Sequence, residues 1–319
     1  MKAQALKQIF LSSSPLLISS DGYAQYMMEA FPPISNVIPE SKIYIEDLFY
    51  KKESKNALET LMKQFSLSDI PDVCITDDYE SNELPPSTIA YYRIFGFITS
   101  DSWWYFSTKQ FERDLLTAEK NDNISCHFLH INSPGGEAWY LDRLSETMRN
   151  LKKPVFALFE KLCCSAAIYI GCHAQNIQAL TQNEQIGCIG TMTDFFSLED
   201  YYKNLGIKHI KVKADQSPLK NKTVDDLIAG KPEKYKKDVL NPLAAQFIQE
   251  IRDNYAKIKD LPDDAPVLQG ETFATQQAIE IGLVDGMMTF TEAIQAAVEM
   301  AKTYDSSLSN LRKALNFIK

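Results

Sequence analysis

Two loops along the chain carry residue types that could stabilise and perform attack on a carbonyl group. The first is Asn132-Ser133-Pro134-Gly135-Gly136, in which two glycines follow a proline. Such a segment lets the backbone reverse sharply and point its N–H groups outward, as in an oxyanion hole or an anion-binding nest. Taken alone, the segment more often forms nothing more than a turn.

The second loop contains a serine among small residues. Ser165 lies in Cys163-Cys164-Ser165-Ala166-Ala167, soon after the predicted strand Val155 to Phe159 and at the predicted start of a helix. The helix dipole favours negative charge at that position, so an alkoxide or a tetrahedral oxyanion would be stabilised there. The alternative is that Ser165 only caps the helix, and composition alone favours the cap.

A nucleophilic serine needs a general base, and the sequence offers two residue types. The four histidines have no carboxylate partner at motif spacing, so a Ser-His-Asp triad is unsupported; they are His127, His130, His173 and His209. A buried lysine is the other route, since moving its pKa from ~10.4 to ~7 takes roughly 4–5 kcal/mol of disfavoured charge. Five lysines cluster late in the chain, most of them expected on the surface: Lys208, Lys211, Lys213, Lys220 and Lys222.

The elements around these loops alternate between strand and helix. Strands are predicted over residues 88–98, 126–131, 154–159 and 177–180, from their β-branched and aromatic content. Helices are predicted over residues 107–120, 140–151 and 165–171. This alternation predicts an α/β domain with a largely parallel sheet, in which ligands collect at the carboxyl ends of the strands.

The second half of the chain continues the pattern with more polar segments. Further helices are predicted from Leu198 to Leu205, from Tyr235 to Ile258 with a kink or break at Pro242, and from Gln276 to Ile281. Between the first two, residues 207–213 alternate as a strand would, and residues 214–232 are predicted to be a loop. The tail from Thr291 is predicted to be helical.

Composition excludes several classes of protein. The 319 residues include 33 basic and 42 acidic side chains, a net charge of −9, with 45% hydrophobic residues. These proportions are those of an ordinary soluble globular protein, and the negative charge argues against a general nucleic-acid or anionic-membrane binder. No signal peptide or membrane anchor is predicted, because the one long charge-free run, Leu162 to Asn183, is too polar for a bilayer.

Six cysteines in a chain of this length favour free thiols in a reducing cytoplasm over a disulfide scaffold. Cys163, Cys164, Cys172 and His173 lack the usual spacings of a zinc site, so no metal is predicted.

Four blocks in order resemble the Ser/Lys peptidases related to signal peptide peptidase A and the phage prohead (capsid) proteases. The blocks are Asn132–Gly136, Cys163–Ile170, Gly187-Cys188-Ile189-Gly190 and Ala278–Asp285. No single block is specific, whereas four in the same order and spacing are. The resemblance covers about two thirds of the chain and implies a Clp protease/crotonase-like spiral of ββα units and a peptidase that needs no cofactor.

The resemblance assigns roles to residues of the first two blocks. Ser165 matches the nucleophile, and the N–H groups of Ala166 and around Gly135 and Gly136 match the oxyanion hole. The pair Ala166-Ala167 replaces the Gly-Gly of the family, and both residues are small enough to leave the backbone accessible. The register against Ile168-Tyr169-Ile170 places the nucleophile at Ser165 rather than at Cys164.

The family's general base is a lysine downstream of a Leu-Gly-Ile/Val element, here Leu205-Gly206-Ile207. Ungapped counting reaches Pro218, which cannot be a base. A two-residue insertion gives Lys220, with Lys222 in reserve and Lys213 as a distant third.

Three functions are compatible with this resemblance. The absence of a predicted membrane anchor favours a phage or prophage prohead protease that cleaves capsid or scaffold proteins. A soluble bacterial signal-peptide-peptidase-like housekeeping protease is the alternative, and a non-catalytic assembly protein on the same fold is the third. Acyl-coenzyme A binding, as in crotonases, is disfavoured because the serine context would then be accidental.

The predicted organisation has three parts: an α-rich N-terminal extension over residues 1–85, a catalytic domain over residues 86–289 and a helical tail over residues 290–319. The extension includes predicted helices at Ala24–Phe31 and within Ile43–Phe65. The resemblance also implies a homo-oligomer acting on peptide or protein substrates. The amphipathic stretch Leu308 to Ile318 offers either an oligomer arm or a surface that packs on its own domain.

Overall fold

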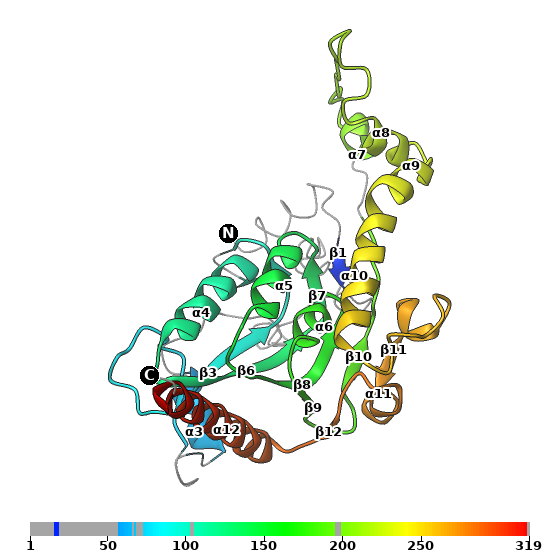
Figure 1. The fold of residues 1–319 in the computed structure, drawn as a ribbon. Coiled ribbons are helices and arrows are strands. Elements are labelled where there is room, and N and C mark those ends of the chain that lie inside the picture. Colours follow the sequence, from blue (N-terminus) through cyan, green and yellow to red (C-terminus); the bar gives the residue numbers. More distant parts are fainter. Residues whose placement is uncertain are drawn as a thin grey trace, which may run out of the picture.

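The computed structural model describes residues 16–18, 57–65, 67, 73–102, 105–194 and 199–317 (Figure 1). The strands are β1 Leu16–Ile18, β2 Ile75–Thr76, β3 Thr88–Phe95, β4 Ile98–Thr99, β5 Phe106–Ser107, β6 Ile124–Ser133, β7 Gly135–Glu137, β8 Val155–Cys164, β9 Asn176–Ala179, β10 Gln185–Gly187, β11 Thr272–Ala274 and β12 Gly286–Met287. The helices are α3 Ala57–Gln64, α4 Thr108–Lys120, α5 Leu141–Arg149, α6 Ala166–Gly171, α7 Glu199–Asn204, α8 Lys222–Ile228, α9 Glu233–Tyr235, α10 Asn241–Asn254, α11 Thr275–Ile281 and α12 Phe290–Phe317.

The central sheet has the strand order β11-β10-β8-β6-β3-β2, and its strands run parallel except β11. Strand β8 pairs with β9 through Phe156–Phe159 and with β10 through Leu162–Cys164. Between these two pairings Lys161 has a φ of 59°, which redirects the strand. Because β6, β8 and β10 are parallel, their carboxyl ends lie at the same edge of the sheet.

A second, smaller sheet has the order β1-β7-β4-β5. Each of its strands β4 and β7 follows a long strand of the central sheet, so that β3-β4 leads through β5 into α4 and β6-β7 leads into α5. These are two successive ββα units. The predicted α/β fold with a mostly parallel sheet of ββα units is confirmed.

The side chains of the central strands alternate between two hydrophobic cores, one on each face of the sheet. Ile89, Tyr91, Phe128 and Phe156 pack on one face with Phe290 and other residues of α12. Their sequence neighbours pack on the opposite face with α4, α5, α6 and α10, among them Tyr92, Leu129, Ala157 and Phe159. A parallel sheet covered by helices on both faces needs apolar residues at successive positions, and the near-continuous hydrophobic runs of these strands supply them (Figure 1).

Helix positions are confirmed where the capping signals are local. Ser107 has an extended backbone before α4, and its side chain accepts a hydrogen bond from the N–H of Gln110. Gly282 ends α11 with a φ of 93°, which favours glycine. The predicted strand over 88–98 is divided into β3 and β4, because Gly96 turns the chain at a φ of 72°.

The predictions for residues 207–232 are wrong in two places. Residues 207–213 form no strand: they lie in an irregular segment whose residues 207–212 are exposed, Ile210 at 79% and Val212 at 87%. Alternation predicts a strand only where a neighbouring strand accepts the pairing, and none of the described strands pairs with this segment. The predicted loop contains helix α8, which begins after Asn221. Together residues 199–235 form an arm that projects from the far end of α10 (Figure 1).

The long helical stretch changes its hydrogen-bond pattern just before Pro242 without leaving the helical conformation. A π-helical turn at Lys236–Leu240 lies between α9 and α10, the backbone of Tyr235 and Leu240 stays helical, and Pro242 lies in the first turn of α10. Proline lacks the N–H that would continue the helical hydrogen-bond ladder, and the first turn is where that loss is tolerated.

The C-terminal tail packs on its own domain over its first half. Ala293, Ile294 and Ala297 of α12 are buried against the sheet. Asp305 accepts hydrogen bonds from Ser87 at 2.5 Å and from Ser125 at 2.7 Å. Leu311 is exposed, and Ile318 lies outside the described residues. The possible oligomer arm is therefore limited to the end of α12.

The predicted N-terminal extension is described only in part. Helix α3 falls within the predicted helical range Ile43–Phe65, and the helix predicted at Ala24–Phe31 lies outside the described residues. None of the helices in the described ranges has the length and apolar character needed to cross a membrane.

The small sheet requires glycine at residue 136. A Cβ atom added there would lie 1.9 Å from the carbonyl oxygen of Ile98 on β4. We expect Gly136→Ala to lower the free energy of unfolding by about 2 kcal/mol, because neither backbone can move away without breaking the β4–β7 pairing. The matched control is Gly190→Ala, whose added Cβ meets nothing closer than 3.8 Å. Equal urea midpoints for the two variants would contradict this reading.

Candidate active site

The predicted nucleophile occupies a strained turn between strand β8 and helix α6. Ser165 has φ 58° and ψ −119°, a conformation that non-glycine residues rarely adopt and that costs of order 1–3 kcal/mol. Its N–H donates to the carbonyl oxygen of Gly187 at 2.8 Å, and its own carbonyl accepts from the N–H of Tyr169 at 3.1 Å. These bonds hold the turn, which has the strand–serine–helix geometry seen at nucleophile elbows.

The Ser165 hydroxyl is buried and unengaged. The residue is 1% exposed, and its Oγ has no hydrogen-bond partner among the described residues. Its side chain makes no cap hydrogen bond to α6, so the capping alternative is wrong. A buried hydroxyl without a hydrogen-bond partner normally lowers the stability of the folded state. Such groups are found where the hydroxyl takes part in function.

The glycine-containing loop lies beside this serine through the register of the sheet. Ser133, at the end of β6, pairs with Cys163 of β8, and Gly187, at the end of β10, pairs with Cys164. Helix α6 contacts β7. The first, second and third sequence blocks therefore converge at the carboxyl edge of the sheet.

The backbone donors at this edge are only partly available. The N–H of Gly135 donates to Ser133 Oγ at 3.1 Å, and Ser133 Oγ in turn donates to the Gly96 carbonyl at 2.6 Å. Ala166 is the first residue of α6, where N–H groups have no intrahelical partner. This role of Ser133 was not predicted from the sequence, because a serine in a turn gives no indication of its hydrogen-bond partners.

The remaining glycine-containing blocks have structural roles. Gly187 has a φ of 123°, and a Cβ there would lie 2.7 Å from the Glu271 carbonyl oxygen. Asp285, at the end of the fourth block, accepts the N–H of Ile177 at 2.8 Å and donates its own N–H to the Ile177 carbonyl. This block therefore fixes the start of β9 rather than contributing to the site.

The histidines lie elsewhere. His127 contacts Glu119 at 3.0 Å and the Tyr92 hydroxyl at 2.9 Å, and burial outweighs Glu119 to lower the pKa of His127. His130 pairs with Glu160 at 2.8 Å, and His209 is exposed on the arm. His173 contacts Glu250, as described below. None of the described histidines therefore forms a hydrogen bond with Ser165.

The predicted lysines lie on the arm, which Figure 1 shows well away from α6. Lys222 pairs with Asp226 at 2.8 Å, and Lys213 pairs with Asp225 at 2.8 Å. Lys220 is exposed in the turn that precedes α8 and forms no ion pair with a described residue. Within one chain, the structure does not bring a predicted base to Ser165.

The cysteines around Ser165 are core residues. Cys163 and Cys164 are fully buried and Cys172 is nearly so, and no disulfide joins any two of the six cysteines. Burial raises the pKa of the Cys163 thiol well above its usual range, which disfavours the reactive thiolate.

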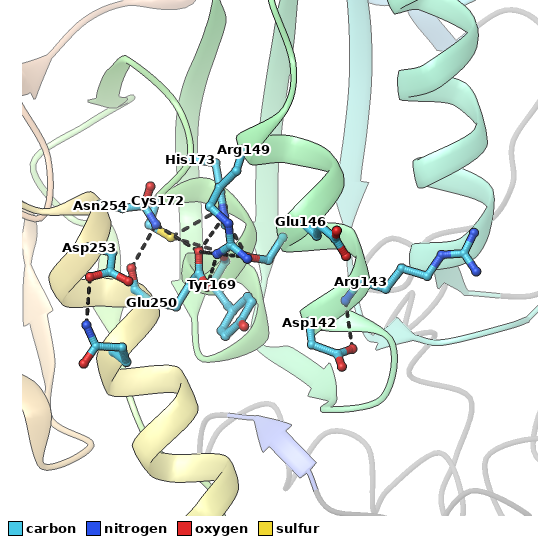
Figure 2. A network of polar contacts seen from close by, with 12 residues as sticks. Asp142, Arg143, Glu146, Arg149, Tyr169, Cys172, His173, Glu250, Asp253 and Asn254 are labelled. Carbon is cyan, nitrogen blue, oxygen red and sulfur yellow. Dashed lines mark hydrogen bonds and ion pairs between the residues drawn. The ribbon is translucent and has the colours of Figure 1, made fainter.

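A buried charge network that sequence reasoning missed ties α6 to α10 (Figure 2). His173, just after α6, contacts Glu250 of α10 at 2.9 Å, and Arg149 of α5 donates to both Glu250 oxygens at 2.6 Å. Arg149 and Glu250 border a pocket of about 360 Å³ that is lined by none of the predicted site residues. The contacting residues lie up to 101 positions apart, so no local spacing could reveal them.

The charges of this network shift the pKa of both partners. Burial disfavours protonated His173, but Cys172 Sγ at 3.6 Å and the Glu250 carboxylate outweigh it and raise the pKa of His173 to about 10. Burial likewise disfavours ionised Glu250, but hydrogen bonds from His173 and Arg149 outweigh it and lower the pKa of Glu250 to about 2. The pair is therefore charged at neutral pH.

Comparison with known proteins gives a family match and two relatives. Residues 147–304 match the model described as "Peptidase family S49". "Putative protease MJ0651" of Methanocaldococcus jannaschii is 25% identical over 190 residues, covering 57% of this chain and 58% of that protein. "Protease 4" of Haemophilus influenzae is 25% identical over 200 residues, covering 59% of this chain and 30% of that protein. The chain thus spans less than two thirds of either relative.

Among solved structures, one match is a "1510-N membrane-bound stomatin-specific protease K138A mutant in complex with a substrate peptide". It is 14% identical, with a TM-score of 0.39, and covers 67% of this chain and 80% of that chain.

The His173–Glu250 pair makes the stability of the protein depend on pH. Above the unfolded-state pKa of about 6.5, only native His173 keeps its proton, so the free energy of unfolding falls as pH rises from about 6.5 towards 10. On the acid side, the Glu250 contribution is lost as pH falls from about 4.5 through about 2. Urea unfolding of the wild-type chain between pH 6 and pH 10 measures the first of these slopes.

The variant for this test is Glu250→Gln, which removes the charge and keeps the shape. It is expected to lose about 3 kcal/mol at pH 7 and to flatten the slope between pH 7 and pH 10. Asp263→Asn is the control, because Asp263 pairs with Arg252 at an exposed position. Parallel pH profiles for wild type and Glu250→Gln would show that this pair does not set the dependence.

Proposed function

Because this chain belongs to peptidase family S49, we propose that it is a serine endopeptidase whose nucleophile is Ser165. The observation that carries the proposal is the strained turn at Ser165, with its buried and unengaged hydroxyl. A serine that only stabilised the fold would be expected to use its hydroxyl as a cap or in a hydrogen bond.

The proposed reaction is acyl transfer in two steps. Ser165 Oγ attacks the carbonyl carbon of a peptide bond while a base takes its proton, and the protonated base then donates to the leaving amine. Water, activated by the same base, hydrolyses the acyl-enzyme and frees Ser165.

The oxyanion formed at each step needs donors beside Ser165. The proposed donors are the N–H of Ala166 at the start of α6 and the backbone around Gly135 and Gly136, each donor contributing ~3 kcal/mol in comparable sites. Because the Gly135 N–H is bonded to Ser133 Oγ, Ala166 and Gly136 are the stronger candidates of the three.

For the base we retain Lys220, with Lys222 in reserve, and propose that it acts on Ser165 of a second copy of the chain. Two observations support this arrangement: Ser165 Oγ has no partner within the described part of its own chain, and the lysines lie on the projecting arm. Lys220 is favoured over Lys222 because Lys222 is paired with Asp226.

The surface of the arm supports the same oligomer. Seven large apolar side chains are exposed on it, a concentration that marks an interaction surface: Tyr202, Leu205, Ile207, Ile210, Val212, Leu219 and Ile228. Docking of this surface would also withdraw the lysine from water, which disfavours its charged form and makes it a better base.

We further propose peptide or protein substrates, with capsid or scaffold proteins of a phage or prophage as the first candidates and a housekeeping role as the alternative. We propose a reducing, cytoplasmic setting for either role, with which the burial of Cys126, Cys163, Cys164 and Cys172 in the core is compatible. Incubating the chain with capsid and scaffold proteins, and with unfolded casein as a general substrate, separates the two: rapid, site-specific cuts in the first set support the prohead role.

Removal of the nucleophile tests the mechanism. Ser165→Ala is expected to lower kcat/KM on casein at least about 10³-fold, because the attacking oxygen is lost. Cys164→Ser is the matched control: it preserves size next to the site and should retain activity. Activity kept in Ser165→Ala, or lost only in Cys164→Ser, would contradict the assignment of Ser165.

Mixing of two inactive variants tests the base and its origin. Ser165→Ala and Lys220→Ala should each be inactive alone and regain activity when co-expressed, because some sites then pair an intact serine with an intact lysine. Lys231→Ala, on the same arm, is the control and should stay active alone. If Lys220→Ala is fully active and Lys222→Ala is inactive, the base is Lys222; if mixing restores nothing, the two residues act within one chain.

A further inference from the structure

A short N-terminal strand lies on the small sheet next to the candidate active site. Strand β1 pairs antiparallel with β7, with Leu16 opposite Glu137, Leu17 opposite Gly136 and Ile18 opposite Gly135. The pairing joins residues more than a hundred positions apart, and two of the three β7 partners belong to the glycine turn. Figure 1 shows β1 beside β7 in the upper part of the domain, near α10.

The position of β1 matters because a strand has only two edges. One edge of β7 pairs with β4 through Ile98 and Gly136, and β1 takes the other. Any extended peptide that joined β7 by main-chain hydrogen bonds would therefore have to replace β1. Strand addition of this kind is a common way for proteins to bind extended peptides.

This edge of β7 lies close to Ser165. Gly135 follows Ser133, which pairs with Cys163 two residues before Ser165, and α6 contacts β7. Since β1 runs antiparallel to β7, its carboxyl-terminal residue Ile18 is the one opposite Gly135. The chain at this point is thus directed towards the turn where the oxyanion donors are proposed.

The chemistry of the segment is that of an extended, uncharged peptide. Leu16, Leu17 and Ile18 are aliphatic, serines flank them at residues 12–14 and 19–20, and no charged residue lies between Lys7 and Asp21. The opposing strand offers two glycines and Glu137, whose carboxylate is already engaged by the Ser100 N–H at 2.7 Å. The segment that occupies this edge therefore carries no charge of its own.

We propose that the chain's own segment Leu16–Ile18 acts as an intramolecular competitor on the β7 edge opposite β4, where it excludes other extended, neutral, aliphatic peptides. The competition with substrate rests on the proposed function; the occupancy of the edge does not. A tethered segment has an effective concentration of about 1 mM, so it lowers the apparent affinity of an identical free peptide with a Kd of about 0.1 mM roughly tenfold.

A binding measurement tests the occupancy without any catalysis. The probe is a fluorescein-labelled peptide with the sequence of residues 12–20, titrated by anisotropy against the full chain carrying Ser165→Ala. Adding Leu17→Pro should tighten binding about tenfold, because proline removes an N–H from β1 and disfavours its pairing. Leu17→Val, which retains strand propensity, is the control and should bind as the parent does.

Two outcomes would overturn the proposal: equal affinity in all three proteins, or no peptide binding by the Leu17→Pro protein. Should Leu17→Pro prevent folding, Leu17→Gly weakens the strand without the proline ring and has the same expected direction. Thermal unfolding of each variant shows which of them is folded.

The same substitutions with Ser165 intact test the consequence for cleavage. Leu17→Pro should raise kcat/KM on a quenched fluorescent peptide about tenfold, through a lower KM, and Leu17→Val should not. If Leu17→Pro tightens peptide binding but no variant cleaves the peptide, the competitor proposal is supported and the proposed peptidase function is contradicted. If the variants cleave the peptide but Leu17→Pro changes neither binding nor rate, the competitor proposal is contradicted and the peptidase function is supported.

Discussion

The backbone conformation of Ser165 is the constraint on which the rest of the site depends. A φ of 58° at a non-glycine residue is held because β8 precedes the turn, α6 follows it, and the Gly187 carbonyl of β10 accepts the Ser165 N–H. Gly187 can accept that bond because its own positive φ and missing side chain let β10 approach β11 closely. The strain at Ser165 is thus offset by the pairing of β8 with β10 and by the Ser165 N–H bond to Gly187. In this conformation the Ser165 hydroxyl has no hydrogen-bond partner among the described residues.

The helix that begins at this serine is short, and its far end is held by charge. His173 and Glu250 join the end of α6 to α10, while Arg149 adds α5 to the same carboxylate. Because α10 carries the projecting arm at its other end, the network connects the proposed nucleophile to the base of the segment that bears the lysines (Figures 1 and 2). A buried ion pair contributes little net stability compared with apolar packing, but it requires one arrangement of its partners. Positioning of α6 relative to α10 is the role that fits this geometry.

The small sheet places two demands on the same glycines. Gly136 must lack a side chain for β4 to approach, and in the proposed reaction the Gly135–Gly136 turn also supplies backbone donors to the oxyanion. The β7 edge beside this turn offers main-chain hydrogen-bonding groups to an extended chain, and β1 uses them. The arm presents the complementary situation: apolar side chains without a covering surface within the described part of the chain.

The sequence by itself determined the elements whose signals are local: the hydrophobic strands β3, β6 and β8, the Ser107 cap of α4, the Gly282 stop of α11 and the helix start after Ser165. The four blocks together also indicated the family, which the match over residues 147–304 supports. Only the tertiary structure decided that residues 207–213 form no strand, since alternation becomes a strand only with a neighbour to pair with. It also decided that Ser165 lacks a base within its described surroundings, that His173 contacts Glu250 and that β1 pairs with the glycine turn. These contacts join residues far apart in the chain and depend on how the layers pack.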